Sequence, residues 1–132
     1  MKVVVAIDSL KGSLSSLEAG DAIRAGILRA DSSAEVLVRP LADGGEGTVE
    51  ALTIGMGGTL QEVRVTGQLG TPVTAVYGIL QDGKTAILEM AAAAGITLVD
   101  EKERNPLNTT TYGVGDMIRD AIAKGCRHFI VG

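Results

Sequence analysis

The stretch KVVVAIDSLKGSLSS, residues 2–16, decides the fold. It begins with a continuous apolar run that ends at Asp8, the pattern typical of a strand buried in a parallel sheet. Ser15 and Glu18 then form a capping box, which predicts a helix from about Leu17 to Ala30. The stretch therefore indicates a strand, a loop and a helix in that order.

A second apolar run, EVLVRPL at residues 35–41, predicts the next strand. A strand, a helix and a strand in succession indicate a parallel crossover. The N-terminal part is therefore predicted to be a Rossmann-like parallel β/α unit. The glycine-rich segment ADGGEGT, residues 42–48, follows it and leads into a short helix at about 48–54.

The pattern changes after Gly58. The segments TLQEVRVTG, TPVTAVYGIL and KTAILEMA alternate as strands do and are separated by QLG and QDG turns, which predicts an antiparallel or mixed sheet. A helix over about 112–125 and the beginning of a strand at RHFIVG follow. We expect an α/β protein with residues 1–57 as a piece of a Rossmann-like domain and 58–132 as a piece of a second α/β domain. Because a strand needs neighbours, a chain that stops at IVG is interpreted as a fragment.

Composition excludes several classes of protein. The net charge is −4, and no patch of lysine and arginine alternates with aromatic residues, so nucleic acid is not an expected partner. The first apolar run is too short for a signal peptide or a membrane span, so no membrane partner is expected. The single cysteine, Cys126, cannot form an internal disulfide and is expected to be a small buried thiol. These features predict a cytoplasmic protein.

Residues 78–85, GILQDGKT, match the phosphate-loop pattern G-x-x-x-x-G-K-[ST]. That pattern binds phosphate only where a strand leads into a helix. Here apolar runs flank Asp82 and Gly83, a pair typical of tight hairpin turns. The segment is therefore interpreted as a hairpin, with a nucleotide site at Lys84 as the alternative.

The loop after the first strand is a candidate anion site. It places a carboxylate at the strand tip, a cation three residues later, and small or hydroxyl-bearing residues before a helix N-terminus, a combination that suits an anion. The alternative is a capped helix with an exposed lysine. The residues concerned are Asp8, Ser9, Lys11, Gly12, Ser13 and Ser15.

The loop after the second strand is the stronger candidate. Asp43 and Glu46 can hold Mg²⁺ through oxygen atoms or accept a proton from a substrate hydroxyl. An ordinary turn with acidic residues at a helix start explains the acids but not three glycines. The other members of this loop are Gly44, Gly45, Gly47 and Thr48.

Several long motifs together resemble the N-terminal part of the type-1 glycerate kinase family. They are AIDSLKGSLSS, PLADGGEGT, VTGQLGTPVTAVYGIL, LEMAAAAGI and NPLNTTTYGVGDMIRDA, and the resemblance runs from Lys2 to Gly132. Enzymes of that family continue past IVG into a glycine-rich GGSATNDGG signature, which this sequence lacks. The resemblance implies a two-domain kinase that uses ATP and Mg²⁺ to phosphorylate D-glycerate, with its ligands between the domains.

The resemblance also implies roles for the two loops. Lys11 with Ser9, Gly12, Ser13 and Ser15 is expected to bind carboxylate or phosphate oxygens of the substrate. Asp43 and Glu46 are expected to contact metal or substrate hydroxyls, and Asp8 to orient Lys11 or a metal-bound water. The catalytic set is thus Lys11, Asp43, Glu46 and Asp8.

Two further residues of the family motifs, Glu89 and Thr111, are added to the substrate-binding set. Glu89 interrupts an apolar run, so it is either a surface acid or a cleft residue. Thr111 has a plain alternative as a helix cap. His128 lacks a visible orienting partner and is interpreted as a packing or surface residue. A non-catalytic module that binds anions or phosphate is the alternative to the kinase.

Overall fold

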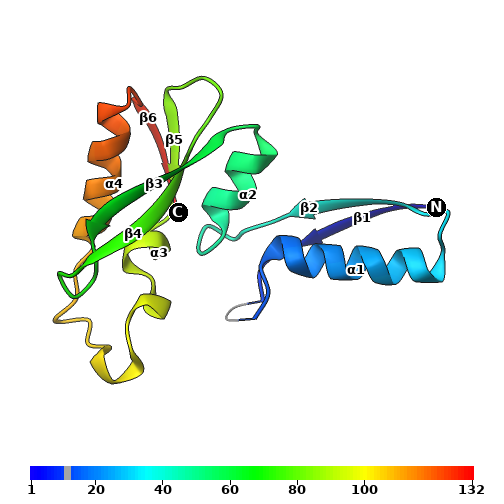
Figure 1. Ribbon diagram of the computed structural model, residues 1–132, viewed down its shortest axis with the longest axis horizontal. Helices are drawn as coiled ribbons and strands as arrows, with labels where there is room; N and C mark the ends of the chain where they lie inside the picture. The colour runs from blue at the N-terminus through cyan, green and yellow to red at the C-terminus, as the bar shows by residue number, and fades with distance from the viewer. Residues whose placement is uncertain (11–12) are drawn as a thin grey trace. The chain divides into compact units, whose positions relative to one another are not determined.

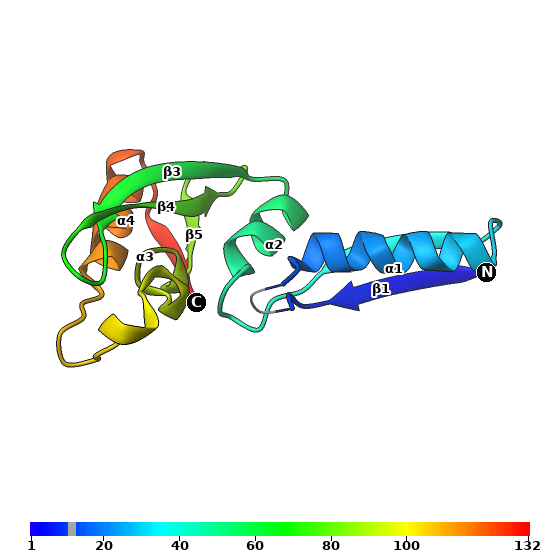
Figure 2. The same cartoon turned by 60° about the horizontal axis from the view of Figure 1, so that its bottom comes forward.

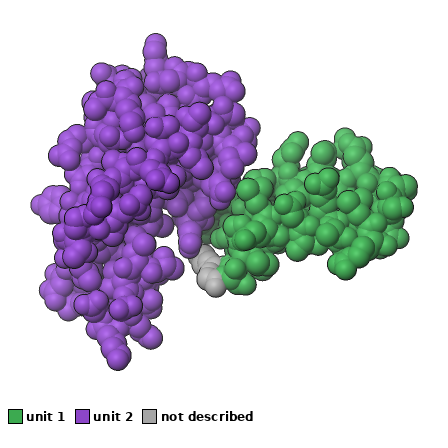
Figure 3. Space-filling model, viewed as in Figure 1, with its two compact units in different colours: residues 1–43 green, residues 44–132 purple. Residues whose placement is uncertain are grey.

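The computed structural model describes residues 1–10 and 13–132 and divides into two compact units, Met1–Asp43 and Gly44–Gly132 (Figure 3). Each unit has its own sheet. None of the described helices has the length and apolar character that crossing a membrane requires.

Unit 1 is a parallel β-α-β unit, as predicted. Strand β1 (Lys2–Ile7) pairs in parallel with β2 (Glu35–Pro40), and helix α1 (Ser16–Ala30) packs on both strands (Figure 1). The predicted capping box at the start of α1 is present. The Glu18 amide donates to Ser15 Oγ at 3.2 Å, and the Ser15 amide donates to Glu18 Oε2 at 2.8 Å.

Unit 2 contains a mixed sheet in the order β3-β4-β5-β6 (Figure 2). The first two pairs are antiparallel and β5-β6 is parallel. This confirms the expected mixed sheet and the strand predicted at the end of the chain. The strand bounds are β3 Thr59–Thr66, β4 Pro72–Ile79, β5 Thr85–Leu88 and β6 His128–Val131.

Helices cover both faces of this sheet. On β4, Tyr77 bonds to a residue of α4, while the adjacent Gly78 contacts Thr53 of α2. Because successive strand residues point to opposite faces, α2 and α4 pack on opposite sides of the sheet. The helical segments of unit 2 are α2 Thr48–Gly55, α3 Ala91–Ala94, the 3-10 turns Ile96–Leu98 and Glu101–Glu103, and α4 Tyr112–Ala123.

A buried hydrophobic cluster lies under α4. It includes Tyr77, Leu88, Met117 and Cys126, all fully buried. Cys126 is a free thiol, as expected, and burial raises its pKa.

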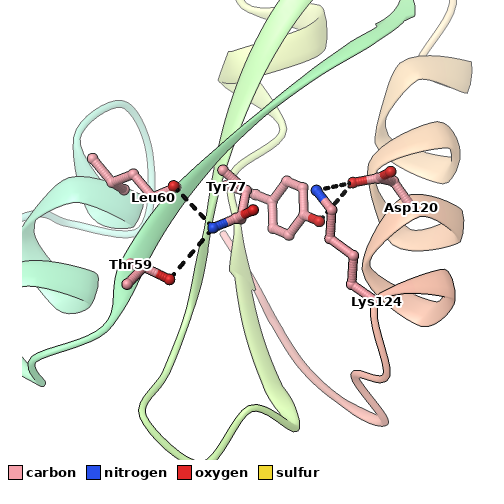
Figure 4. Close-up of polar contacts among 6 residues, drawn as sticks. Thr59, Leu60, Tyr77, Asp120 and Lys124 are labelled. Carbon is pink, nitrogen blue, oxygen red and sulfur yellow. Dashed lines mark hydrogen bonds and ion pairs between the residues drawn. The ribbon is translucent and has the colours of Figure 1, made fainter.

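A polar network closes this core at Tyr77. The Tyr77 hydroxyl donates to Asp120 Oδ2 at 2.6 Å, and Lys124 Nζ donates to the same oxygen at 2.8 Å (Figure 4). Lys124 Nζ also lies 5.3 Å from the Tyr77 ring centroid, within the range of a cation–π contact. Burial, followed by the hydrogen bond to Asp120, raises the pKa of Tyr77 to about 12. On the neighbouring strand β3, Gln61 pairs with Tyr77, and its side-chain amide donates to Thr59 Oγ1 at 3.4 Å and to Leu60 O at 3.1 Å.

The boundary between the compact units differs from the predicted domain boundary. The sequence pattern places it after residue 57, whereas the structure divides at Asp43 because α2 packs on β3, β4 and β5. The helix was assigned to the first domain because it follows the parallel strands in the chain. The boundary after residue 57 stays a prediction for the domains of a longer protein.

Candidate functional site

The first loop of unit 1 begins at the carboxyl end of β1. The Asp8 carboxylate accepts the Ser9 amide at 2.7 Å, so it fixes the backbone where the strand ends. Further along, the Leu10 carbonyl accepts the Ser13 amide at 2.8 Å, and the Leu10 amide donates to Leu14 O at 2.8 Å. Lys11 and Gly12, the predicted cation and its neighbour, lie outside the described residues.

The hydroxyls of this loop have different environments. Ser15 Oγ is used at the start of α1, where it accepts the Glu18 amide and donates to Glu18 Oε2. Ser13 is exposed. The plain alternative of a capped helix thus describes Ser15 correctly, and the loop before it holds the remaining candidates.

Asp43 follows β2 at the same edge of the unit 1 sheet. Ile7 pairs with Pro40 at the ends of the two parallel strands, and the Leu41 amide continues the pairing by donating to Ile7 O at 3.0 Å. Both loops of unit 1 therefore leave the carboxyl edge of one parallel sheet, where ligands bind in open α/β folds.

The glycine-rich loop opens unit 2. Gly44 and Gly47 have φ of 102° and 91°, a left-handed conformation that other residues rarely adopt. An added Cβ at either position would meet nothing within 4 Å, so backbone conformation and not crowding requires glycine there. The loop then turns directly into α2, whose N-cap residue Gly47 has no side chain with which to cap the helix.

Glu89 supplies the missing cap from a distant part of the chain. It follows β5 directly and is only 8% exposed, and its Oε2 accepts the Val49 amide at 3.0 Å. The burial of Glu89 contradicts the predicted alternative of a surface acid. Glu89 is a buried acid bonded to the first turn of the helix that follows the glycine-rich loop.

Gly132 places the end of β6 beside Glu89. Its amide donates to Leu88 O at 2.9 Å and its carbonyl accepts the Met90 amide at 2.8 Å, so its bonds flank Glu89. A Cβ added to Gly132 would lie 2.3 Å from Gly44 O. The glycine-rich loop therefore rests against the carboxyl ends of the parallel pair β5 and β6.

Thr48, the first residue of α2, adds a buried hydroxyl. It is 6% exposed, and its Oγ1 has no hydrogen-bond partner among the described residues. A buried hydroxyl without a partner costs free energy. At the end of the glycine-rich loop, a bound ligand or a water molecule can supply the missing hydrogen bond to the Thr48 hydroxyl.

The donor atoms present suit Mg²⁺ held mainly by a substrate. Asp43 and Glu46 are both exposed carboxylates. Mg²⁺ prefers oxygen ligands and is usually bound by one or two carboxylates together with substrate phosphates and water. Within the described part of the chain no group of three or more histidine, cysteine, aspartate or glutamate residues is arranged to hold a metal by itself.

The phosphate-loop pattern of residues 78–85 is a hairpin, as predicted. It joins the antiparallel strands β4 and β5, and no helix follows it. The Asp82 carboxylate accepts the amides of Lys84 and Thr85 at 2.9 Å and the Thr85 hydroxyl at 2.6 Å. These bonds, led by that from the Thr85 hydroxyl, lower the pKa of Asp82 to about 2. The turn thus already contains its own anion.

The remaining candidates lie elsewhere in unit 2. Thr111 is exposed and is the N-cap residue of α4, but its side chain makes no capping bond. Thr110 Oγ1 instead accepts the Tyr112 amide at 3.2 Å. His128 is exposed at the start of β6, in agreement with its interpretation as a surface residue.

Two hollows in unit 2 are lined by none of the predicted site residues. One, of about 200 Å³, lies among the 3-10 turns and the β3-β4 turn. The other, of about 520 Å³, lies between β3, the β3-β4 turn and α4. Their lining residues include Gln68, Ile96, Val99 and Arg104 for the first and Arg64, Thr66, Asp116 and Arg119 for the second.

Sequence reasoning missed the residues that join the glycine-rich loop to the strands. Val49 takes part only through its backbone amide, and Gly132 only through backbone contacts. Neither has a side chain that indicates chemistry, so no residue pattern identifies them.

Comparisons with known proteins agree with this arrangement. The family model described as "Glycerate kinase family" matches residues 3–132. The chain is 48% identical to the glycerate kinase of Bacillus subtilis (strain 168) and 46% identical to the glycerate 2-kinase of Escherichia coli (strain K12), over 100% of this chain and 35% of each relative. The chain thus spans about a third of the length of these relatives.

A solved structure gives the same result. The putative glycerate kinase 2 from Salmonella typhimurium LT2 is 48% identical, with a TM-score of 0.77 over 100% of this chain and 35% of that one. Sequence and structure agree over the whole segment, and the chain belongs to the glycerate kinase family.

Proposed function

We propose that this chain forms the N-terminal part of a kinase that transfers the γ-phosphoryl group of ATP to D-glycerate. The observation that carries the proposal is that every residue of the chain aligns with glycerate kinases at up to 48% identity, both glycine-rich loop and strand ends included. The position of both candidate loops at carboxyl edges of parallel strands supports it.

The proposed reaction needs little covalent chemistry from the protein. A glycerate hydroxyl oxygen bonds to the γ-phosphorus, the bond from that phosphorus to the ADP oxygen breaks, and the hydroxyl proton passes to a base. Positioning and charge neutralisation therefore dominate catalysis. Bound Mg²⁺ would supply charge neutralisation at the phosphates.

Each loop has a proposed role in this reaction. In the first loop, Lys11 with Ser9, Gly12, Ser13 and Ser15 binds carboxylate or phosphate oxygens, and Asp8 orients Lys11 or a metal-bound water. Asp43 and Glu46 contact Mg²⁺ or accept the hydroxyl proton. Gly44, Gly45, Gly47, Thr48 and Thr111 contact the substrate. The single buried cysteine suits the cytoplasm as the place of this activity.

Substitution of Lys11 tests the proposal. In an enzyme of full family length that carries these 132 residues, Lys11→Ala should lower kcat/KM for glycerate by at least about tenfold, because a charge-assisted contact to an anion is lost. The assay couples ADP release to NADH oxidation, and ³¹P NMR identifies the phosphorylated hydroxyl. Lys84→Ala, in the hairpin, is the matched control and should leave kcat and KM for glycerate unchanged.

The same preparation separates the kinase from the alternative function. Calorimetric binding of glycerate or MgATP without turnover in the wild-type enzyme would support a non-catalytic anion-binding module. If Lys11→Ala has the kinetic parameters of the wild type, Lys11 does not bind the substrate.

A further inference from the structure

Glu89 is a buried acid whose bonding partner lies far away in sequence. Its Oε2 accepts the amide of Val49, which is 40 residues earlier and is the second residue of α2. An ionised carboxylate that is buried must be compensated by hydrogen bonds or opposite charge. The N-terminus of a helix offers both, because its free amides carry a partial positive charge.

In the part of the chain that the structure describes, no ion pair competes with this helix end for Glu89. The ion pairs found among the described residues are Lys2–Glu35, Arg119–Asp116 and Lys124–Asp120, and none includes Glu89. The α2 N-terminus is therefore the positive partner that the structure provides. The helix end, in turn, already has an anion, so a substrate phosphate or carboxylate placed there would meet a like charge at short range.

The same bond fixes the glycine-rich loop. Val49 directly follows Thr48, whose buried hydroxyl has no partner in the described part of the chain, and Gly44 O packs against Gly132. Gly44 and Gly47 have left-handed backbone and carry no side chain of their own that could hold the loop. Glu89 is the side chain that ties this loop to the end of β5.

We propose that Glu89 is a positioning residue that acts as the resident anion of the α2 N-terminus and fixes the loop of residues 44–48, so that the anionic groups of the substrates bind elsewhere. This rests on the proposed kinase function. The resemblance implied that Glu89 contacts the substrate. Under this proposal, Glu89 instead positions the loop that contacts the substrate. Thr48 and Glu46 are left to recognise hydroxyl groups or metal.

Two substitutions at Glu89 separate positioning from direct contact. Glu89→Gln keeps an acceptor oxygen for the Val49 amide and removes the charge, whereas Glu89→Ala removes both. Misplacement of a substrate loop by about 1 Å can cost about a hundredfold in rate, so we expect Glu89→Ala to lower kcat by at least about tenfold. We expect Glu89→Gln to restore kcat to within about threefold of wild type, with KM for glycerate and MgATP unchanged.

Amide hydrogen exchange gives a readout that does not depend on activity. Exchange at Val49 should accelerate at least about tenfold in Glu89→Ala and much less in Glu89→Gln, because local opening follows loss of the bond. Glu62→Gln, an exposed glutamate on β3 of the same unit, is the matched control and should stay within about twofold of wild type in both measurements.

The outcomes distinguish this proposal from the kinase assignment. If wild-type enzyme does not phosphorylate glycerate, the proposed function fails, and the exchange measurement still decides whether Glu89 holds the loop. If Glu89→Gln loses as much kcat as Glu89→Ala, or changes either KM more than about threefold, Glu89 contacts substrate or metal directly and the positioning role is overturned. Unchanged exchange at Val49 in Glu89→Ala would overturn it as well.

Discussion

Several acidic side chains in the described part of this protein accept backbone amides. Asp8, Asp82 and Glu89 each accept an amide hydrogen where a strand ends or a turn begins. Asp82 and Asp8 bond to near neighbours, whereas Glu89 reaches a helix in another part of unit 2. Carboxylates used in this way hold loops in place.

Tyr77 allows a direct test of the buried network at the core. Burial and the bond to Asp120 raise its pKa to about 12, from an ordinary value of about 10. A phenol whose pKa is raised on folding contributes stability below pH of about 10, and this contribution is lost as the pH rises through about 12. Absorbance at about 295 nm, recorded in a Tyr112→Phe background that leaves Tyr77 as the one phenol of this chain, should show a midpoint near 12.

Asp120→Asn in the same background removes one charged partner, so the midpoint should fall below that of the parent. A parent midpoint at about 10 would mean that the network does not form.

At the scale of elements, the mixed sheet of unit 2 depends on close approach between α2 and β4. Thr53 of α2 is fully buried, and a Cβ added to Gly78 would lie 1.8 Å from its Oγ1. Gly78 also occupies the first fixed place of the phosphate-loop pattern. Position 78 requires glycine because a larger residue would collide with Thr53, and not because a phosphate binds there.

A double-mutant cycle tests this contact. Gly78→Ala should lower the free energy of unfolding by about 2 kcal/mol, because it overpacks the interface. Thr53→Ala removes the obstructing hydroxyl, which has no hydrogen-bond partner in the described structure. The two changes together should therefore cost less than their sum, with a coupling energy of about 1 kcal/mol in urea unfolding.

Gly115→Ala is the control for the effect of alanine on backbone entropy. Gly115 lies in α4 with nothing within 4 Å of an added Cβ, so the substitution should be neutral or stabilising. Strict additivity of the Gly78 and Thr53 variants would show that α2 does not pack closely on β4.

At the scale of the molecule, the two compact units differ in how well they can support themselves. The main buried cluster lies entirely within residues 44–132, and this unit has a four-stranded sheet with helices on both faces. Residues 1–43 have a two-stranded parallel sheet and one helix. Chains of this size rarely bury enough apolar surface to fold alone.

Separate expression of the units tests this difference. Residues 44–132 should give a dispersed amide NMR spectrum and a cooperative thermal transition, because their core is complete within the unit. Residues 1–43 alone should give neither. A dispersed spectrum from residues 1–43 alone would contradict the expectation.

Much of the fold follows from local patterns. The capping box at Ser15 and Glu18 forms because its partners lie one helical turn apart. The hairpin at Asp82 forms because the turn residues supply their own hydrogen bonds. The glycine-rich loop was identified as a candidate site because glycines and acids cluster within a few residues at a strand end.

The sequence by itself determined the α/β class, the order of most elements and the family, since periodicity, caps and motifs are properties of neighbouring residues. Only the tertiary structure decided that α2 packs with the second sheet, that Glu89 caps it, and that Gly132 rests against Gly44. The physical reason is that these contacts join backbone groups to residues tens of positions away. Such contacts form only when packing brings the segments together, and a backbone amide has no signature in the sequence.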